Sequence, residues 1–413
     1  MLPTTVFFSV GEPSGDLHGA NLACELRSQA GEAIRCVGFG GPRMARAGVE
    51  LHTDLTQHAV MGFVRVLSSI PQLLRLKRQA ERYFREEKPD AVVLIDFPGF
   101  NWHIAKAAKK HGVPVFYYGT PQLWGWASWR VKKLRRNVDH ALCKLPFEET
   151  WLRERGCNAT YVGHPYFDEL RTRKLDEAFV AQQRAQSGPL VTLLPGSRTQ
   201  EVRANFAEQC AAAKQIVKSV PAARFAVAAF KDSHLPIIEA AIRQADFPAG
   251  VAPAVHVGRT PELIEAATCC VAVSGSVSLE LLYHRKPTVI VYRISRLMHA
   301  IQKRFRRVRY ITLVNLLTAA ELFPNPVGAY DPQDPRDQHV LMPEYLACAD
   351  VSAQLAEHVV TWLTDKAAYT RTEQGLRELC DRIGSGGASQ RAAEYLLSAL
   401  DRAPAQVAAT RVA

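Results

Sequence analysis

The chain has 413 residues, of which 47% are hydrophobic and 22% are charged. This composition is that of a globular protein with a large core, and it excludes a disordered chain. The length is enough for two or three domains. The formal net charge of +11 and a pI near 9.3 indicate an anionic partner: nucleic acid, acidic lipid or a phosphorylated substrate.

The cysteines and the N-terminus indicate a cytoplasmic protein. The nine cysteines are scattered, with neither a C-x-x-C pair nor a Cys/His spacing suited to a metal, so we interpret them as reduced thiols. No apolar run reaches the length of a membrane span. Met1–Val10 lacks the positively charged start of a signal peptide, so it is predicted to hold the first strand.

Apolar runs alternate with helix-like segments through the first part of the chain. This pattern predicts an α/β fold with a parallel, doubly wound sheet. The first strand, Val6–Val10, is followed by a turn at Gly11–Asp16 and a helix over Leu17–Gln29. The further strands expected here are Ile34–Gly38, Ala91–Ile95, Val113–Tyr118, Ala141–Lys144 and Thr160–Val162.

A second series of the same kind follows a polar, helical segment over Leu170–Gly188. Its strands are expected at Leu190–Leu194, Phe225–Ala229, Val255–Val257, Cys270–Val273 and Thr288–Tyr292. We therefore expect an N-terminal domain over residues 1–165 and a C-terminal domain over residues 166–385. Residues 386–413 would form a last helix and tail, and whether it packs back on the first domain is left open. The carboxyl ends of both sets of strands would face a cleft.

Position relative to a strand separates the acidic residues of the first domain. Asp96 directly follows the strand Ala91–Ile95, at the end where such sheets bind ligands, and is our candidate for a general base. Asp90 precedes the same strand, so we interpret it as a structural acid. Asp16 and His18 lie at the first strand–helix turn, also at a carboxyl end. A capping or packing role fits His18 equally well.

In the second domain, the strand Leu190–Leu194 ends at Pro195-Gly196, and a helix follows. Ser197 and Thr199 are candidate caps of that helix. The unpaired N–H groups of the helix start and the neighbouring Arg198 predict a phosphate site. An ordinary strand–helix turn with a solvated arginine is the alternative, because the stretch is neither a Walker nor a dinucleotide motif.

Another helix start is predicted near Val277, after the strand that ends at Val273. The turn residues Ser274, Gly275 and Ser276 offer N–H groups to a second phosphate or a nucleotide oxygen. Glu280, one helical turn further, would accept the two hydroxyls of a ribose or complement the helix dipole. The chain has no D-x-D pair, so we expect no metal. The charge of a diphosphate would then be balanced by Arg198 and the helix N-termini.

Three segments are compatible with a membrane surface. Val60–Leu76 is an apolar stripe with interspersed basic residues, which predicts an interfacial helix or a floor for acyl chains; core packing is the alternative. Basic clusters lie at Arg130–Arg136, just after three tryptophans, and at Lys303–Arg309. Both suit an anionic membrane surface, with a solvated basic face as the alternative.

A series of short motifs runs in order from about residue 6 to residue 322. The motifs are G-E-P-S-G-D (Gly11–Asp16), G-G-P-R-M (Gly40–Met44), A-V-M-G-F (Ala59–Phe63), K-P-D-A-V-V-L-I-D-F-P-G-F-N (Lys88–Asn101), P-Q-L-W-G-W (Pro121–Trp126), L-P-F-E (Leu145–Glu148), V-G-H-P (Val162–Pro165), L-P-G-S-R-x-x-E-V (Leu194–Val202) and S-G-S-V-S-L-E (Ser274–Glu280). In these motifs the chain resembles the lipid-A-disaccharide synthase family.

The resemblance implies a GT-B fold with two Rossmann-like domains and an inverting glycosyl transfer. UDP-2,3-diacylglucosamine would give its sugar to the 6-hydroxyl of 2,3-diacylglucosamine 1-phosphate, releasing UDP. Carried onto the matching motifs, the resemblance adds Ser14, Gly15, Glu201 and Asn315 to the substrate-binding residues.

The chain departs from the family pattern at several positions. Pro13 stands for an alanine in the first motif, and Val314 stands for the proline of L-P-N-L-L. Gly99 replaces the second aspartate of D-x-P-D-F-N, so Asp96 keeps the role of base alone. Phe323–Pro343 is rich in proline and aspartate and is expected to be an inserted surface loop without chemistry.

We therefore expect a glycosyltransferase that is peripheral on the cytoplasmic face of the inner membrane and needs neither cofactor nor metal. Another GT-B-type UDP-GlcNAc transferase and a UDP-sugar epimerase remain alternatives of the same architecture. A basic nucleic-acid-binding protein is the alternative of a different class. It is disfavoured because the aromatic residues do not form a basic stacking stripe. A homodimer stays open.

Overall fold

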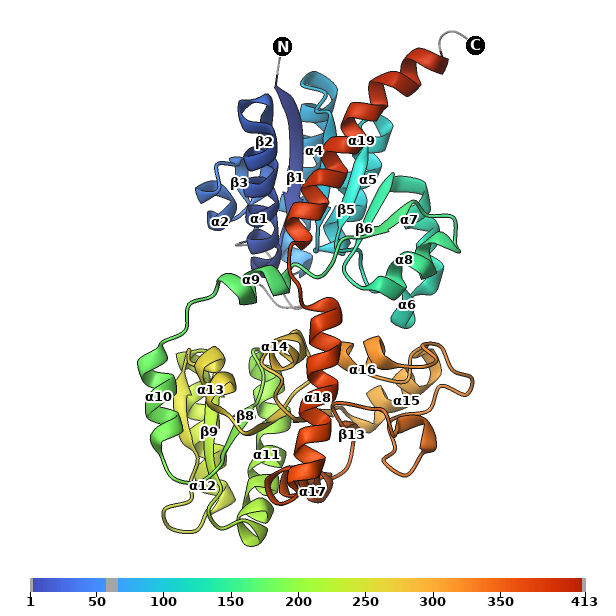
Figure 1. The fold of residues 1–413 in the computed structure, drawn as a ribbon. Helices are drawn as coiled ribbons and strands as arrows, with labels where there is room; N and C mark the ends of the chain where they lie inside the picture. The colour runs from blue at the N-terminus through green and yellow to red at the C-terminus, as the bar shows by residue number, and fades with distance from the viewer. Residues whose placement is uncertain (1–2, 57–65, 411–413) are drawn as a thin grey trace. The chain divides into compact units, whose positions relative to one another are not determined.

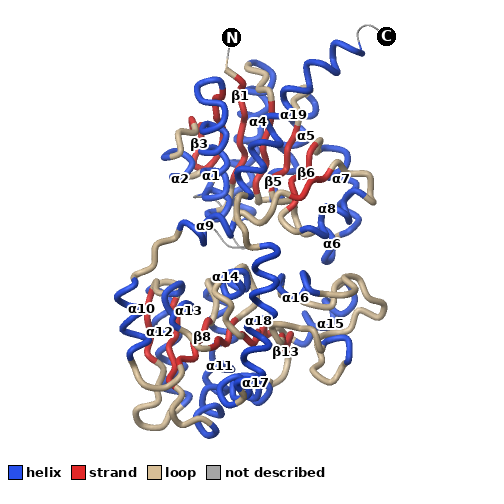
Figure 2. Tube along the Cα trace, viewed as in Figure 1, coloured by secondary structure: helices blue, strands red, loops and turns tan. Residues whose placement is uncertain are grey.

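The computed structural model describes residues 3–56 and 66–410. The chain divides into two compact units, one made of Met1–Glu169 with Gly386–Ala413 and the other of Leu170–Ser385. Each unit contains a parallel sheet flanked by helices, as Figure 1 and Figure 2 show. The predicted α/β fold of two Rossmann-like units is confirmed.

The sheet of the first unit has the strand order β3-β2-β1-β4-β5-β6-β7, and all neighbouring pairs are parallel. Its central strands are buried along their length, which explains why they are continuous apolar runs in the sequence. The strands are β1 (Thr4–Val10), β2 (Ile34–Gly40), β3 (Glu50–Asp54), β4 (Ala91–Ile95), β5 (Val115–Tyr118), β6 (His140–Cys143) and β7 (Ala159–Tyr161).

The helices of this unit connect successive strands. The first begins at Pro13, three residues after the end of β1, where the sequence predicts a turn through Asp16. Proline suits the first helical position because it lacks an N–H. The connecting helices are α1 (Pro13–Ala30), α2 (Pro42–Arg46), α4 (Val66–Glu86), α5 (Pro98–Lys110), α6 (Leu123–Trp126), α7 (Val131–Asn137) and α8 (Pro146–Arg153). Two further helices follow β7: α9 (Tyr166–Thr172), which continues into the second unit, and α19 (Ala388–Thr410).

The C-terminal helix α19 is part of the first unit. Ala392, Ala393 and Leu396 are buried in the same core as residues of α1 and β1. The carboxylate of Asp168, on α9, accepts the backbone N–H groups of Ala388 (3.1 Å) and Ser389 (2.9 Å). Because this contact ties the start of α9 to α19, the boundary falls after Glu169 and not after residue 165.

The second unit has a sheet of order β10-β9-β8-β11-β12-β13, again parallel throughout. Its strands are β8 (Leu190–Leu194), β9 (Arg224–Ala229), β10 (Ala254–Val257), β11 (Cys269–Ala272), β12 (Thr288–Arg293) and β13 (Glu344–Ala347). Its helices are α10 (Glu177–Ala185), α11 (Thr199–Ser219), α12 (Leu235–Ala245), α13 (Thr260–Ala266), α14 (Val277–Tyr283), α15 (Arg296–Phe305), α16 (Leu313–Thr318), α17 (Ser352–Thr364) and α18 (Lys366–Ile383).

The segment Phe323–Pro343 is anchored to the second unit by a buried ion pair. The guanidinium group of Arg309 donates to both carboxylate oxygens of Asp337 (2.8 and 2.6 Å), and both side chains are almost inaccessible. Asp334 accepts a further bond from Arg309 at 2.9 Å. The expectation of Arg309 as part of a basic membrane patch is therefore wrong, because its charge is neutralised inside the protein.

The structure describes only part of the apolar stripe that was expected to contact lipid. The stripe Val60–Leu76 lies partly outside the described residues; within its described part, Leu74 is exposed and Leu76 is buried. In the part of the chain that the structure describes, no helix has both the length and the apolar character needed to cross a membrane.

Candidate active site

Asp96 directly follows β4, in a loop with an unusual backbone. Asp96 and Phe97 both have a positive φ, 49° and 43°, a conformation that costs energy in residues other than glycine. Hydrogen bonds hold the loop in place: the backbone oxygen of Asp96 accepts from the Asn101 side-chain amide and from the Tyr117 hydroxyl, each at 2.8 Å. Such a supported, strained loop is frequent at functional sites.

Asn101 links this loop to the neighbouring strand β1. Its amide oxygen accepts from the Ser9 hydroxyl at 2.7 Å, and its NH₂ group also donates to the backbone oxygens of Ser9 and Ile95. Both side chains are fully buried. The core of the sheet therefore fixes the backbone of Asp96 through its carbonyl oxygen. These hydrogen bonds do not involve the carboxylate, which can contact a ligand.

The carboxylate of Asp96 lies beside Lys144, with 3.6 Å between Oδ1 and Nζ. The two side chains are 21% and 18% exposed, so the pair is accessible to a ligand but mostly shielded from bulk water. Lys144 follows β6, two strands along the sheet from β4. Both residues therefore stand at the carboxyl edge of the sheet, where parallel sheets bind ligands.

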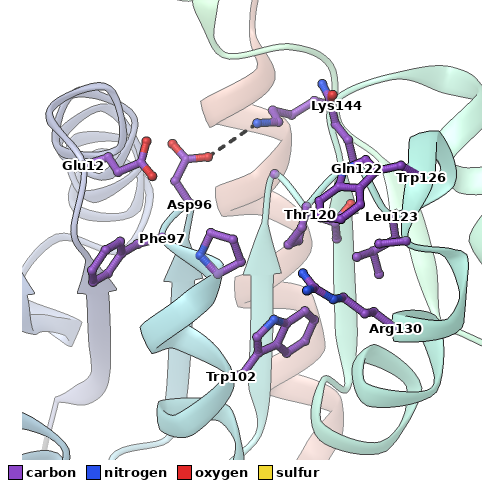
Figure 3. Close-up of a pocket in the computed structure, with 14 residues that line it drawn as sticks. Glu12, Asp96, Phe97, Trp102, Thr120, Gln122, Leu123, Trp126, Arg130 and Lys144 are labelled. Carbon is purple, nitrogen blue, oxygen red and sulfur yellow. Dashed lines mark ion pairs between the residues drawn. The ribbon is translucent and has the colours of Figure 1, made fainter. Parts of the chain in front are cut away.

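A pocket of about 320 Å³ surrounds this pair in the first unit (Figure 3). Its walls combine two carboxylates, two cationic side chains and two tryptophans, and its lining residues are Glu12, Asp96, Phe97, Pro98, Trp102, Gly119, Thr120, Pro121, Gln122, Leu123, Trp126, Ala127, Arg130 and Lys144. The Arg130 guanidinium stacks 5.2 Å from the Trp126 ring. The pocket thus combines carboxylates, cationic side chains that can pair with a phosphate, and apolar surface.

Asp16 and His18 lie on the first turns of α1, and both side chains are buried. The carboxylate of Asp16 accepts three backbone N–H groups, those of Gly41 (2.9 Å), Arg43 (3.0 Å) and Met44 (3.1 Å), so it caps α2. A catalytic role of Asp16 stays a prediction. Burial lowers the pKa of His18 to about 4, with Asp96 as the largest opposing charge. His18 is therefore a buried, neutral imidazole at physiological pH.

Ser14 and Gly15 form the start of α1 at the same edge of the sheet. Ser14 is exposed, and Gly15 allows close packing, because a Cβ atom there would lie 3.0 Å from Val10 Cγ1 and 3.3 Å from Asp96 Oδ2. The first turn of α1 thus approaches Asp96 closely. Substrate binding by Ser14 and Gly15 stays a prediction.

In the second unit, the loops after β8 and β11 lie together. The strands are adjacent, and the Val273 N–H donates to the Leu194 oxygen at 3.1 Å. Gly196, at φ 116°, allows this approach, since a Cβ atom there would lie 3.2 Å from Val273 Cγ2. The predicted phosphate loop Ser197–Arg198 and the turn Ser274–Ser276 are therefore neighbours at the carboxyl edge of this sheet.

Arg198, and not Ser197 or Thr199, is the N-cap residue of α11. No side chain caps the helix start through a serine or threonine hydroxyl; instead the Glu201 carboxylate accepts the Arg198 N–H at 3.2 Å and pairs with its guanidinium at 2.8 Å. The expected capping role of Ser197 and Thr199 is therefore wrong. The Arg198 side chain is 80% exposed, which leaves its guanidinium accessible to an anion.

Glu280 is buried in the first turn of α14, with its side chain 4% exposed. Its carboxylate accepts from the Arg173 guanidinium at 2.5 Å. Gly275 and Ser276, just before the helix, are exposed, and the Ser274 hydroxyl donates to the Ile311 oxygen at 2.9 Å. Arg173 holds the Glu280 carboxylate in one orientation. A ligand would therefore meet a carboxylate whose position is already fixed.

Asn315 is fully buried on α16 and serves the protein interior. Its amide donates to the Met342 oxygen (2.7 Å) and to Glu344 (2.9 Å), and its oxygen accepts the Met342 N–H (3.2 Å). Burial raises the pKa of Glu344, on β13, to about 7. Through these contacts Asn315 joins α16 to β13, and a role in substrate binding stays a prediction.

Within the described ranges, residues 3–56 and 66–410, no three His, Cys, Asp or Glu side chains form a group that would hold a metal ion.

The family model described as lipid-A-disaccharide synthetase matches residues 6–368. The chain belongs to this family. As a member of the lipid-A-disaccharide synthetase family it is a glycosyltransferase of lipid A biosynthesis.

Relatives of this family match nearly the whole chain. A lipid-A-disaccharide synthase of Myxococcus xanthus (strain DK1622) is 34% identical over 400 residues, covering 96% of this chain and 98% of the relative. The lipid-A-disaccharide synthase of Geobacter sulfurreducens (strain ATCC 51573 / DSM 12127 / PCA) is 32% identical over 402 residues, covering 96% and 97%. The family name thus rests on the full length of the chain.

Solved structures share the GT-B fold. A putative UDP-N-acetylglucosamine 2-epimerase from Listeria monocytogenes superposes with a TM-score of 0.64 at 12% identity, covering 97% of this chain and 96% of the other. The calicheamicin glycosyltransferase CalG4 superposes with a TM-score of 0.56 at 15% identity, covering 97% and 100%. At such low identity these matches support the architecture alone.

Lys144 and Glu12 line the pocket around Asp96 but are not among the site residues predicted from the sequence. The sequence pattern predicts Lys144 as the last residue of a strand, whereas β6 ends at Cys143. The rule that selected Asp96, a charged residue just after a strand, would have found Lys144 with the boundary moved by one residue. Glu12 stands between β1 and α1 and satisfies the same rule.

Proposed function

We propose that this chain transfers 2,3-diacylglucosamine from UDP to the 6-hydroxyl of 2,3-diacylglucosamine 1-phosphate and releases UDP. The observation that carries the proposal is the Asp96 carboxylate in a pocket that also holds Lys144, Arg130 and tryptophan rings. An acceptor with a sugar hydroxyl, a phosphate and acyl chains requires these three kinds of partner. Family membership supports both the UDP-sugar donor and the lipid acceptor.

In the proposed reaction, Asp96 takes the proton of the acceptor 6-hydroxyl. The oxygen then forms a bond to the anomeric carbon of the donor sugar from the face opposite to UDP. The bond from that carbon to the diphosphate breaks, and UDP leaves with the electron pair. Lys144, 3.6 Å from Asp96, would position the carboxylate and pair with the acceptor phosphate.

UDP is proposed to bind at the carboxyl edge of the second sheet. The exposed Arg198 guanidinium and the loop N–H groups near Ser197, Ser274 and Gly275 would hold the diphosphate. Glu280, oriented by Arg173, would accept the ribose hydroxyls. Glu201 would act indirectly, since it holds Arg198 through two contacts.

Replacing Lys144 by methionine should raise the KM for the acceptor about 10- to 100-fold, because a lost charge-assisted contact costs about 1.5–3 kcal/mol. UDP affinity, measured by calorimetry, should stay unchanged. Lys110→Met is the matched control, since Lys110 is 68% exposed and pairs with Glu81 on α4. An unchanged acceptor KM in Lys144→Met would remove Lys144 from the acceptor site.

Chelation should leave turnover intact. The chain has no D-x-D pair, and the proposed diphosphate site relies on an arginine and backbone N–H groups, which need no divalent ion. Initial rates in excess EDTA should equal those in magnesium. Activity that disappears with EDTA and returns with magnesium contradicts this prediction.

Three measurements separate the proposal from its alternatives. Titration with UDP and with an unrelated oligonucleotide should give saturable binding for UDP alone, and the opposite result favours a nucleic-acid-binding protein. Incubation with UDP-GlcNAc alone should leave the sugar unchanged, whereas a UDP-sugar epimerase would convert it. Non-acylated acceptors should not react, whereas a transferase for another acceptor would accept them.

The lipid substrates lead us to propose peripheral attachment to an anionic membrane surface. On the first unit, the exposed Trp126 and Trp129 adjoin the basic segment Arg130–Arg136. This combination is typical of proteins that bind at the level of lipid headgroups.

A further inference from the structure

Helix α15, Arg296–Phe305, has no buried residue, although its sequence is strongly amphipathic. Four large apolar side chains are exposed: Leu297 (73%), Met298 (46%), Ile301 (44%) and Phe305 (55%). Their spacing of one, four and eight positions places them in a single stripe along the helix. They make up much of the large apolar surface exposed on the described residues.

The orientation of α15 is opposite to that of an ordinary surface helix. A helix on a globular protein buries its apolar stripe and exposes its polar face. On α15, the partly covered residues are His299, about 160° around the helix from Ile301, and Gln302, about 100° around from it. The apolar stripe therefore faces solvent, and Figure 1 shows α15 at the periphery of the second unit.

The charges around the stripe have one sign. Arg296, Lys303, Arg304 and Arg307 are exposed, and among the described residues no carboxylate lies within ion-pair distance of them. The sequence has no Asp or Glu between Glu280 and Glu321. An apolar stripe whose charged neighbours are all basic complements a surface that is apolar inside and anionic at its rim.

We propose that α15 is a membrane-insertion helix that binds the second unit to an anionic lipid surface. The apolar stripe would lie among the acyl chains, and the four basic side chains would contact the lipid phosphates. The inference rests on the proposed function because it takes the carboxyl edge of the second sheet as the binding site of an acylated donor. Helix α15 starts three residues after β12, whose carboxyl end shares its edge of the sheet with the proposed UDP loops. Insertion would bring that edge to the membrane, where an acylated donor resides.

The test is co-sedimentation of the full chain with vesicles of 30% phosphatidylglycerol in phosphatidylcholine. Replacing Leu297, Met298, Ile301 and Phe305 by serine should weaken binding at least 100-fold. Replacing the four exposed basic residues by serine should weaken it about fivefold per charge at low salt, and much less at high salt. Phe230→Ser, which removes a phenyl ring that is 58% exposed elsewhere in the same unit, should bind as the parent does.

Three results would overturn the proposal. Unchanged vesicle binding by the four-serine variant removes α15 from the membrane contact. A variant that binds vesicles normally but loses self-association in sedimentation velocity makes the stripe a surface for a second copy. Normal vesicle binding with a raised KM for the acylated donor makes it an acyl-chain site. Turnover in detergent micelles, expected to be retained, reports on the proposed function separately, because micelles remove the need for membrane attachment.

Discussion

Replacing Asp96 by asparagine should lower kcat by about 10²–10⁴-fold, the effect of removing a positioned base. The amide keeps the shape of the side chain but cannot accept the proton of the acceptor hydroxyl. The loop should stay in place, since Asn101 and Tyr117 bind the backbone oxygen of Asp96 and not its carboxylate. UDP affinity should be nearly unchanged, because the proposed UDP residues belong to the other unit.

Asp90→Asn is the matched control at the opposite end of β4. Asp90 is exposed, and its carboxylate accepts the Thr5 N–H at 2.7 Å, so it joins β4 to β1. We expect this variant to lose some stability in urea before it loses turnover. If Asp96→Asn turns over within about tenfold of the parent, Asp96 is a positioning residue. His18 and Glu12 would then be the groups to test, since Asp16 is committed to three N–H groups.

Replacing Glu280 by alanine should weaken UDP binding about 10- to 100-fold. The loss of hydrogen bonds between a charged group and the ribose costs about 1.5–3 kcal/mol. The carboxylate is held by Arg173 and is almost fully buried, so no conformational freedom has to be lost when UDP binds. Calorimetric titration of UDP into the folded variant measures the effect, and turnover at saturating UDP-2,3-diacylglucosamine should fall much less.

Glu262→Ala provides the comparison for Glu280→Ala. Glu262 is also a buried glutamate in the first turn of a helix, α13, but this helix follows the edge strand β10. Both variants lose the same interaction with a helix dipole, and only Glu280 lies beside the turn Ser274–Ser276. Equal UDP affinities in the two variants would assign Glu280 to stabilising α14.

The strands buried on both faces were predictable from the sequence to within a residue or two. Ala91–Ile95 and Leu190–Leu194 are continuous apolar runs because helices cover both sides of each sheet. The strands that were missed, β3 and β13, are edge strands. The sequence of β3, E-L-H-T-D, is mostly polar because an edge strand is partly solvated, so it lacks the apolar run.

Residues of the candidate site were predictable where their position just after a strand places them at the carboxyl edge of the sheet. Asp96 lies at the carboxyl edge because β4 ends at Ile95. What the sequence could not supply were contacts between distant segments. Asp16 is a helix cap only because α2 lies against α1, and Arg309 is buried only because Asp337, 28 residues later, neutralises it. The outward-facing stripe of α15 likewise required knowledge of which helix face the protein covers.

The most direct test of this account is product analysis after incubation with UDP-2,3-diacylglucosamine and 2,3-diacylglucosamine 1-phosphate. The parent should form one disaccharide 1-phosphate for each UDP released, joined at the 6-hydroxyl with the anomeric configuration opposite to that of the donor. The Asp96→Asn variant should form this product at least about 100-fold more slowly. UDP release without disaccharide, or a disaccharide that retains the donor configuration, would contradict an inverting transfer by Asp96.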